Sequence, residues 1–366
     1  MKKHKILFTI CTYQLAGTER QLLTLCKYLR EKFDVIVACP KESSLNDKFK
    51  DLKIKVVNIG FSHIFSLKSL FGLIWVIKNE NVDIVHNYLG KSAFLGTLAA
   101  MLSGIKNIIT TRHFVKTYHA FSKNPFERIS NLLGYKFINL LNKRLIAVSE
   151  AVRQSIIKRE KIDIDKIITI YNGTDLNPKE IKESNGYKIG VVSRLSIEKG
   201  IRYLIDAMPD VLIKFPDAEY LIAGSGLEEE LLKQKVNNLG LTDKVKFLGY
   251  IDDIEEFLKK IDVFVLPSLE ESFGLTLVEA MVSGKPVIAT KTEGAKEVIG
   301  DDSGILVEKA SSKALAGAIS SLFKDRELAK KLAIAGQKRA TSLFSADKMA
   351  RKTENLYRLL LQEKET

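Results

Sequence analysis

Cysteine is scarce in this sequence, and the few cysteines present exclude two kinds of site. The 366 residues contain three cysteines, all within the first forty positions: Cys11, Cys26 and Cys39. An odd number argues against a disulfide framework, and the wide spacing is not that of metal ligands. We therefore expect small buried or half-buried thiols in a protein of a reducing compartment.

Long apolar runs are also missing. No run reaches the roughly 18 residues that are needed to span a bilayer. Segment 1–10 begins with positive charge, but polar residues interrupt it at once and no cleavage pattern follows, so we interpret it as a first β-strand rather than a signal peptide. We expect a cytoplasmic protein, either free or peripheral on the inner face of the cell membrane.

Motifs of several other functional classes are absent or incomplete. Gly224–Gly226 follows a predicted strand, but Glu229 occupies the position of the third glycine of a dinucleotide-binding loop. No G-x-S-x-G elbow marks a hydrolase. No helix-turn-helix, zinc-finger or RNP pattern indicates nucleic-acid binding. The sequence therefore argues against nicotinamide chemistry, serine hydrolysis and nucleic-acid recognition.

Positive charge is concentrated in the first half of the chain. Residues 1–180 contain 29 Lys and Arg against 15 Asp and Glu, a net charge of +14, whereas the remainder contains 28 and 29, a net charge of −1. With nucleic acid set aside, a basic half favours an acidic substrate or an anionic lipid surface as its partner.

Short apolar strands alternate with amphipathic helical stretches along the first half. The predicted strands are KILFTI, DVIVACP, IKVVNIG, DIVHNY, NIITTRH, RLIAVS and IITIYNG. This alternation is typical of a parallel, doubly wound sheet, in which ligands bind at the carboxyl ends of the strands. A chain of this length suits two such domains.

The segment Pro267–Gly284 combines two acids with the start of a helix. It follows the apolar run Val263–Leu266, which predicts a buried strand. Glu271 lies in the loop after this strand, and Glu279 lies inside the following helix, so both side chains can reach the same edge of the sheet. There the two carboxylates could accept hydrogen bonds from hydroxyl groups. The alternative is two solvated acids beside a helix start.

Cations and backbone amides complete this candidate site. Phe273, Gly274 and Leu275 form the helix start, where free N–H groups favour an anion. A second strand-to-helix junction carries Arg194 and Lys199, two fixed cations that suit a diphosphate. Carboxylates for hydroxyl groups and donors for phosphate together fit a sugar that bears a diphosphate.

These two junctions, with the segments YLIAGSG, VKFLGYI and PVIAT, resemble the C-terminal half of the retaining GT-B glycosyltransferases, specifically glycosyltransferase family 4 (glycosyl transferases group 1). The resemblance covers nearly the whole chain. It implies two Rossmann-like, doubly wound parallel-sheet domains that face each other across a cleft. Residues 1–176 would form the acceptor-side domain and residues 187–344 the nucleotide-sugar-binding domain, with a C-terminal helix, 345–366, crossing back to the first domain.

The resemblance also implies an activity. A hexosyl-type, retaining enzyme of this family moves a sugar from a UDP- or GDP-sugar to a hydroxyl of a glycan or lipid-linked acceptor, typically in cell-surface polysaccharide synthesis. By this resemblance Arg194 and Lys199 neutralise the diphosphate. Glu271 holds donor-sugar hydroxyls near the reacting carbon, and Glu279 accepts hydrogen bonds from the ribose. His113, in a T-x-H sequence at a strand end, would reach the donor sugar from the first domain.

Three further residues are expected to contact the donor. Family members usually carry two glycines in the loop after the first strand, where this chain has Ala16 and Gly17. Gly17 would let the backbone approach the donor phosphates, although a plain strand-to-helix turn is the alternative. Backbone around Gly249 and Tyr250 is expected to recognise the base.

No cofactor or metal is expected besides the nucleoside diphosphate sugar as co-substrate. Asp163 and Asp165 spell a D-x-D motif, but they lie in a charged stretch before a strand, so we interpret them as a solvated turn. Two alternatives stay open: a sugar-nucleotide isomerase (epimerase) on the same fold, and a non-catalytic sugar-nucleotide-binding subunit. The intact set of Arg194, Lys199 and Glu271 argues against both.

A basic amphipathic stretch, Phe126–Arg144, is predicted in the first half. Together with the preceding loop it defines residues 116–144 as a candidate contact with an anionic membrane surface. The alternative is a helix that covers the sheet, and we favour this for the later part of the stretch.

Overall fold

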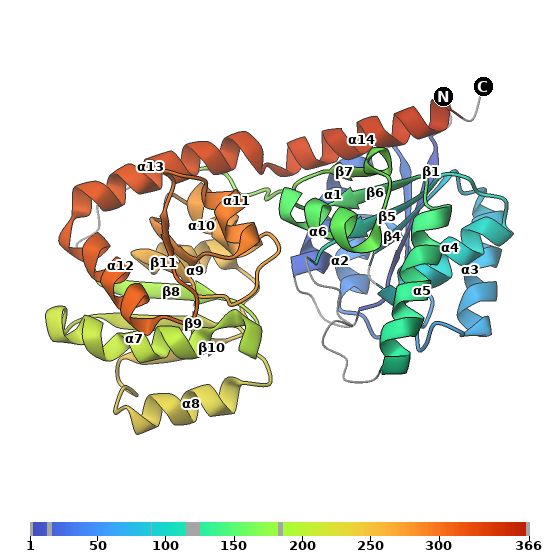
Figure 1. Cartoon of the computed structure of the whole chain (residues 1–366). Coiled ribbons are helices and arrows are strands. Elements are labelled where there is room, and N and C mark those ends of the chain that lie inside the picture. Colours follow the sequence, from blue (N-terminus) through green and yellow to red (C-terminus); the bar gives the residue numbers. More distant parts are fainter. Residues whose placement is uncertain (1–2, 13–16, 89, 115–124, 182–185, 364–366) are drawn as a thin grey trace. The chain divides into compact units, whose positions relative to one another are not determined.

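The structure is a computed structural model, and it describes residues 3–12, 17–88, 90–114, 125–181 and 186–363. The chain divides into two compact units. The first comprises Met1–Gly173 together with Ala346–Thr366, and the second comprises Thr174–Ser345. Each unit contains a parallel sheet with helices packed around it (Figure 1). The predicted fold class, two Rossmann-like parallel-sheet domains, is confirmed.

Seven strands of the described chain form the sheet of the first unit, in the order β3-β2-β1-β4-β5-β6-β7, with every pair parallel. The strands are β1 (Lys5–Ile10), β2 (Asp34–Cys39), β3 (Lys55–Asn58), β4 (Ile84–Tyr88), β5 (Ile108–Arg112), β6 (Arg144–Ala147) and β7 (Ile167–Thr169). They coincide with the predicted apolar runs. The central strands are apolar along their length because both of their faces are buried.

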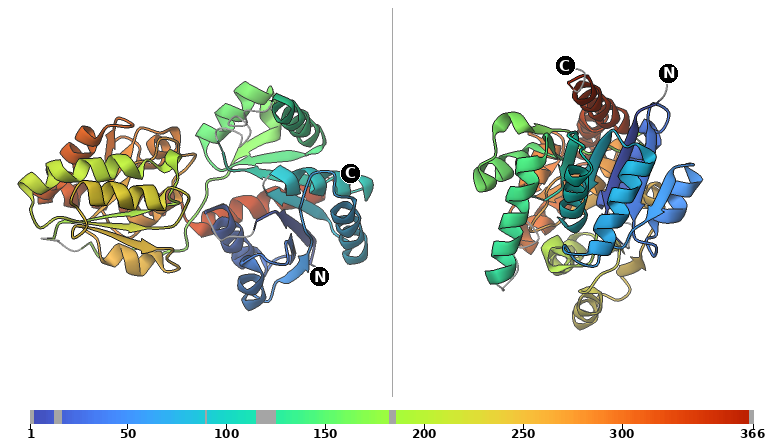
Figure 2. Two further views of the ribbon diagram at one scale, coloured as in Figure 1. Left: turned by 90° about the horizontal axis from the view of Figure 1, so that it is seen from below. Right: turned by 90° about the vertical axis from the view of Figure 1, so that its right-hand side faces the viewer.

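Two layers of helices cover this sheet (Figure 2). They are α1 (Gly17–Leu29), α2 (Leu45–Asp51), α3 (Leu67–Glu80), α4 (Gly90–Leu102), α5 (Pro125–Leu141), α6 (Glu150–Glu160), the 3-10 helix η2 (Ile164–Lys166) and α14 (Ala346–Gln362). Alternate residues of β1 face opposite layers. Phe8 packs in a core with α1, α2 and α14, whereas Leu7 packs in a core with α3 and α4. The last helix thus belongs to the core of the first unit.

The second unit repeats this plan with a parallel sheet in the order β10-β9-β8-β11-β12-β13. Its strands are β8 (Lys188–Val192), β9 (Glu219–Ala223), β10 (Val245–Gly249), β11 (Val263–Leu266), β12 (Val287–Thr290) and β13 (Ile305–Val307). Its helices are η3 (Ile197–Lys199), α7 (Ile201–Lys214), α8 (Glu229–Asn238), α9 (Ile254–Lys259), α10 (Leu275–Val282), α11 (Glu293–Ile299), α12 (Ser312–Lys324) and α13 (Arg326–Leu343).

Each sheet has one position where the strand order reverses. In the first sheet β1 lies between β2 and β4, and in the second β8 lies between β9 and β11. The loops that leave the carboxyl ends of such neighbouring strands turn to opposite faces, which opens a crevice where ligands bind. In the second unit these loops follow β8 and β11, and they carry the residues that the sequence singles out.

Gly96 of α4 lies against a buried hydrogen-bond network that joins this helix to the sheet. Thr9 Oγ1 donates to Asn87 Oδ1 at 2.8 Å, and Asn87 Nδ2 donates to Thr97 Oγ1 at 3.2 Å. A Cβ atom on Gly96 would lie 2.0 Å from Asn87 Oδ1. The helix can approach the sheet this closely only because residue 96 has no side chain.

We therefore predict that Gly96→Ala destabilises the first unit by about 2–3 kcal/mol, because the new methyl group displaces Asn87 and breaks buried hydrogen bonds. Thermal unfolding should show a lower melting temperature for that unit. Gly317→Ala in α12 is the matched control, since a Cβ there meets open space and alanine favours a helix. Equal melting temperatures for the two variants would contradict the prediction.

Candidate active site

Two loops at the strand-order reversal of the second sheet are joined by an ion pair. Lys199 ends η3 after β8, and its Nζ lies 2.7 Å from Oε2 of Glu271 in the loop after β11. Ser268 Oγ donates to the same carboxylate oxygen at 3.4 Å. Both charged side chains are less than one-fifth exposed, at 19% and 14%, so water screens the pair only partly. The fold thus brings together two predicted site residues that are 72 positions apart.

The backbone holds these loops together as well. The N–H of Leu269 donates to the carbonyl of Glu198 at 2.8 Å. Gly200 follows with a φ of +64°, and a Cβ atom there would lie 2.1 Å from the carbonyl oxygen of Pro267. This close approach requires glycine. It fixes the backbone next to Lys199, from which the side chain extends to Glu271.

Arg194 lies in the same loop but is largely exposed. Its Nη2 contacts Glu198 Oε1 at 3.3 Å, and Ser196 Oγ donates to the same oxygen at 2.6 Å. Burial raises the pKa of Glu198, but the hydrogen bonds from Ser196 and from its own backbone, with the charges of Arg194 and Lys199, outweigh burial and hold that pKa below its usual range. An exposed pair of this kind is weak, so the guanidinium can exchange its partner for an anionic ligand.

Two glycines of the neighbouring turn support the Arg194 loop. A Cβ on Gly224, whose φ is +130°, would lie 1.8 Å from the carbonyl oxygen of Ser193. One on Gly226 would lie 2.2 Å from the carbonyl oxygen of Leu195. The N–H of Leu195 also donates to the Ser225 carbonyl at 2.9 Å. The sequence placed this glycine pair in an incomplete dinucleotide loop and in a segment that resembles the family, but its packing role was not predicted, although its position after a strand could have signalled it.

The helix start beside Glu271 is formed as predicted. Gly274 is the N-cap of α10, with a φ of +94°, and Leu275 is the first helical residue, so the first N–H groups of the helix have no acceptor within it. Phe273 is buried and packs edge-on against Phe344, with ring centroids 5.3 Å apart. Glu279 is buried within the same helix, at 7% exposure. A helix start of this kind favours an anion.

The remaining donor-site candidates of the second unit lie at the end of β10. Gly249 has a φ of +66°, and its carbonyl accepts a hydrogen bond from the N–H of Gly224 at 2.7 Å. Tyr250 follows and is half exposed, with its hydroxyl 3.5 Å from an oxygen of Asp252. This loop therefore touches the turn that supports Arg194.

His113 and Gly17 lie in the first unit. His113 directly follows β5, is 8% exposed, and lies against Tyr88 with ring centroids 5.4 Å apart. Burial lowers the pKa of His113 to about 3, so its imidazole is neutral at physiological pH. Gly17 begins α1, and no described atom lies within 4 Å of the position of a Cβ there, so packing within the described chain does not demand glycine.

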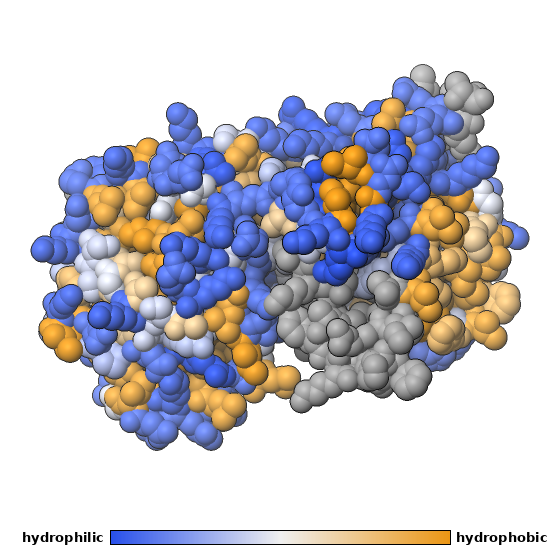
Figure 3. Space-filling model, in the orientation of Figure 1, coloured by the Kyte–Doolittle hydropathy of each residue, from blue (hydrophilic) through white to orange (hydrophobic). Residues whose placement is uncertain are grey.

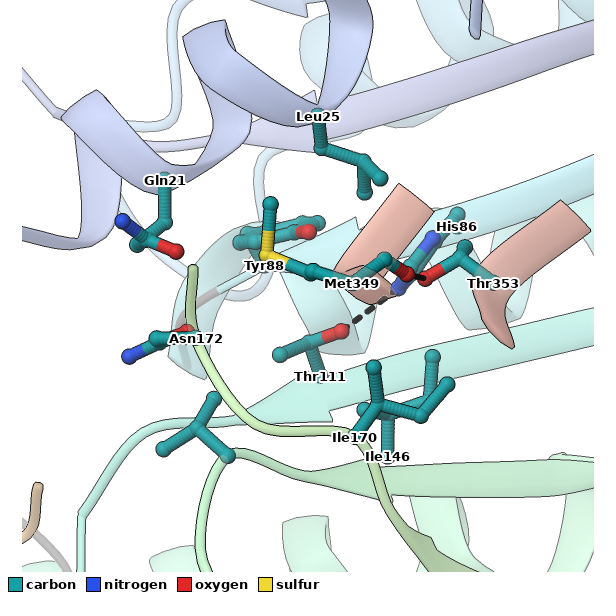
Figure 4. Close-up of a pocket in the computed structure, with 11 residues that line it drawn as sticks. Gln21, Leu25, His86, Tyr88, Thr111, Ile146, Ile170, Asn172, Met349 and Thr353 are labelled. Atoms are coloured by element: carbon teal, nitrogen blue, oxygen red, sulfur yellow. Dashed lines mark hydrogen bonds between the residues drawn. The ribbon is translucent and has the colours of Figure 1, made fainter. Parts of the chain in front are cut away.

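His86 has a structural role in the first unit. It is fully buried in β4, with Nδ1 2.6 Å from the Tyr357 hydroxyl of α14 and Nε2 2.7 Å from Thr111 Oγ1. Figure 4 shows the imidazole directed toward Thr111 beside a small cavity. The cavity has a volume of about 10 Å³, room for about one water molecule, and is lined by α1, β4, β5, β6 and α14. Burial lowers the pKa of His86 to about 3, with a smaller contribution from His113.

The D-x-D motif has a local explanation. Asp163 caps η2 by accepting a hydrogen bond from the N–H of Asp165 at 3.1 Å, as expected for a solvated turn. In the described part of the chain, no cluster of three or more His, Cys, Asp or Glu residues could hold a metal ion. The cationic groups near the candidate site are instead Lys199 and Arg194.

Comparisons with known proteins identify related sequences and structures. Residues 174–339 match the family model "Glycosyl transferases group 1", and residues 15–178 match "Glycosyltransferase Family 4". The chain is 29% identical over 340 residues, 86% of each protein, to the UDP-Gal:alpha-D-GlcNAc-diphosphoundecaprenol alpha-1,3-galactosyltransferase of Escherichia coli. It is 28% identical over 326 residues, 82% of each protein, to the capsular polysaccharide biosynthesis glycosyltransferase CapM of Staphylococcus aureus. The crystal structure of Anabaena Alr3699/HepE in complex with UDP and glucose is similar with a TM-score of 0.85 and 25% identity, over 97% of this chain and 99% of that one.

The two buried histidines predict acid sensitivity of the first unit. Their folded-state pKa of about 3 lies below the ordinary value of 6.5, so only the unfolded chain takes up protons as pH falls below about 6.5. Each histidine should then cost about 2 kcal/mol of unfolding free energy at pH 5 relative to pH 7. Urea unfolding at both values measures this. His86→Gln should remove about half of the loss, and His63→Gln, at an exposed position, is the control; equal losses in both variants would contradict the assignment.

Proposed function

The chain belongs to glycosyltransferase family 4, and from this premise we propose that it is a retaining enzyme that moves a sugar from a nucleoside diphosphate sugar to a hydroxyl acceptor. The observation that carries the proposal is the Lys199–Glu271 pair beside the start of α10. A cation, a carboxylate and the backbone amides of a helix start meet there, at the carboxyl edge where α/β sheets bind ligands.

We assign the diphosphate to the cationic side of this arrangement. Lys199 can donate three hydrogen bonds, and Arg194 can bind phosphate oxygens in a bidentate way. The amides at the start of α10 add donors of fixed direction. These groups stabilise the negative charge that builds on the leaving diphosphate in the transition state.

We assign the hydroxyl groups of the donor to the carboxylates. Glu271 lies next to Lys199, so a sugar attached to the diphosphate would have its hydroxyl groups within reach of this side chain. Glu279 lies eight residues further along, inside α10, and accepts hydrogen bonds from the ribose. Gly249 and Tyr250 at the end of β10 contact the base through the backbone.

The first unit contributes two proposed contacts. His113 is neutral at physiological pH, so it offers one N–H donor and one acceptor to a sugar hydroxyl without adding charge. Gly17, at the start of α1, admits the donor phosphates close to the backbone. Both assignments are carried by the family resemblance.

We propose front-side transfer for the chemical step. The bond between the anomeric carbon and the phosphate oxygen breaks first, giving an oxocarbenium-like state. The acceptor oxygen attacks the same face, and the leaving phosphate oxygen takes the acceptor proton. No carboxylate is clearly placed as a covalent nucleophile in this scheme, and retention of configuration follows from same-face attack. Lys199 and Arg194 supply the positive charge, so the proposal includes turnover without a metal or another cofactor.

The names of the relatives support a proposal for the donor and acceptor classes. The Escherichia coli relative is named for UDP-Gal and a diphosphoundecaprenol acceptor, and the Anabaena structure contains UDP. We therefore propose a UDP-sugar before a GDP-sugar as donor, and a lipid-linked glycan of cell-surface polysaccharide synthesis as acceptor.

An enzyme that uses a lipid-linked acceptor must act at a membrane surface. No helix in the described part of the chain is long and apolar enough to cross a bilayer. We propose peripheral association with an anionic leaflet on the cytoplasmic side. Of the predicted contact, residues 116–144, positions 116–124 lie outside the described residues. In the later part, Phe137 of α5 packs on Phe94 of α4 with ring centroids 5.2 Å apart, and Lys143, just after α5, pairs with Glu363 at 2.7 Å, so both side chains are engaged within the first unit.

A donor screen tests the proposed function. Selective binding stabilises the native state, so a saturating UDP-sugar should raise the melting temperature, and the screen compares UDP-, GDP- and ADP-sugars. The same donor should then be consumed with a lipid-diphosphate-sugar acceptor, with and without EDTA. No thermal response to any nucleoside diphosphate sugar would contradict the proposal, and loss of transfer in EDTA with rescue by Mn²⁺ would overturn metal independence.

Removal of either cation should slow transfer. We expect Lys199→Ala and Arg194→Ala each to cost about 2–4 kcal/mol of transition-state stabilisation, a fall in kcat/KM of about 30- to 900-fold. Lys246→Ala is the matched control, because Lys246 also forms an ion pair, with Glu219 at 2.9 Å, but lies at the opposite edge of the same sheet. Parental kcat/KM in the Lys199 and Arg194 variants would remove the diphosphate role.

A further inference from the structure

The outer face of α3 carries a stripe of exposed apolar side chains. Leu67, Phe71 and Trp75 follow one another at intervals of four residues, which places them on one side of the helix. They are 66%, 63% and 60% exposed, and Phe65, just before the helix, is 73% exposed. Large exposed apolar side chains scattered singly are ordinary, but a contiguous row of them marks an interaction surface.

This stripe is separate from the face with which α3 packs on its own domain. The inner face of the helix consists of Leu70, Leu73, Val76 and Ile77, all buried in the core shared with α4 and the sheet. The helix is therefore apolar on two sides, and the core accounts for only one of them. Stability of the first unit does not explain the outer stripe.

The surface continues onto the end of α4. Met101 and Leu102 are exposed there, and α3 and α4 lie side by side on one face of the sheet (Figure 2). Figure 3 shows the apolar area over these two helices, at the right of the view. We call the α3 stripe with Phe65, Met101 and Leu102 the α3 face.

The charges around the α3 face have one sign. Lys68 and Lys78 are exposed on α3 itself, and Lys106 is exposed just after α4. Glu80, the acidic residue of α3, is engaged away from the stripe: its carboxylate lies 2.8 Å from Lys55 and 3.7 Å from Lys5. An apolar row bordered by lysines is complementary to a layer that is hydrophobic inside and negatively charged at its surface.

We propose that the α3 face docks on an anionic lipid bilayer, with the apolar row in the interfacial layer and the lysines at the headgroups. Aromatic and aliphatic side chains on one face with lysines beside them are typical of helices that lie in the interface plane, and tryptophan prefers that depth. The cores of protein–protein interfaces are depleted in lysine, and two copies of a strongly basic half repel each other. These points favour lipid over a protein partner or a second copy.

The position of the face agrees with an acceptor that arrives from the membrane. Leu67 begins α3, and Phe65 lies just before it, in the segment that follows β3 at the carboxyl edge of the first sheet, the same edge at which His113 follows β5. The link between the α3 face and the acceptor rests on the proposed function, because it assumes a lipid-linked acceptor. The docking surface itself rests only on exposure and charge.

Trp75 provides a fluorescent probe of vesicle binding, because it is the only tryptophan of the sequence. Its fluorescence therefore reports on the α3 face alone. Vesicles of phosphatidylglycerol and phosphatidylcholine should shift the emission of the full-length protein to the blue, and brominated lipid should quench it. Pure phosphatidylcholine should bind at least about tenfold more weakly, and added salt should weaken binding to the anionic vesicles.

Variants locate the contact. Leu67→Ser with Phe71→Ser keeps the tryptophan probe and should weaken vesicle binding about tenfold or more, because two apolar side chains no longer enter the interface. Ile213→Ser with Leu231→Ser, at exposed apolar positions of α7 and α8, is the matched control and should bind like the parent. Lys68→Gln with Lys78→Gln should reduce the salt dependence. Unchanged melting temperatures establish that each variant is folded.

Three outcomes would overturn the proposal. One is no emission shift with anionic vesicles at low salt, and another is equal binding by the Leu67/Phe71 variant and the parent. The third is a blue shift that grows with protein concentration without lipid, which would identify a second copy as the occupant. Transfer to a water-soluble acceptor analogue separates this proposal from the enzymatic one: the α3 variants should keep that activity, and vesicle binding by a protein without transferase activity would leave the docking face standing.

Discussion

The close packing of the loops after β8 and β11 is the constraint on which the candidate site depends. The backbone at Gly200 approaches Pro267 so closely that a side chain would not fit there. This packing brings the loop that carries Lys199 next to the loop that carries Glu271. Each charge is mostly removed from water, and loss of either would leave the other buried without a counter-charge. In the proposed function, a diphosphate that takes hydrogen bonds from Lys199 would supply the counter-charge and leave Glu271 available to sugar hydroxyls. The pair would thus keep the two proposed ligand-binding groups in position before the ligand arrives.

The same constraint extends outward through glycines. Gly224 and Gly226 let the turn after β9 touch the backbone of Ser193 and Leu195, which flank Arg194. The backbone on both sides of Arg194 is thus supported by a turn of the neighbouring strand. In the sequence, a glycine pair after a strand resembles part of a dinucleotide loop. Here the two glycines allow two backbone segments to pack in contact.

Sequence patterns predicted the strands and the second-unit site because both depend on local signals. A parallel strand buried on both faces is a short apolar run, and Glu271, Arg194 and Lys199 lie within a few residues of such strand ends. Partners from distant positions leave no such signal. The bond between His86 and Tyr357 joins residues 271 positions apart, so the sequence could not identify His86 as a buried link to α14. The outer stripe of α3 was not predicted for another reason. Its residues have helical spacing like those of the buried face, and periodicity does not tell which of two apolar faces is covered.

Charge is distributed differently in the two halves of the chain. The second half of the chain has a net charge of −1, yet it presents Lys199 and Arg194 beside a helix start. A small anion such as a diphosphate responds to groups within a few ångströms, so fixed local cations suffice and net charge is nearly irrelevant to its binding. The +14 of the first half is spread over many side chains, whose separate fields fade within about 8 Å in physiological salt. Positive charge distributed in this way contributes little to the binding of one small ligand. Its contributions to the binding of an extended negative surface add together, because each lysine contacts different headgroups. The proposed donor binding in the second unit therefore depends on local geometry, and the proposed lipid docking in the first unit depends on distributed charge beside an apolar row.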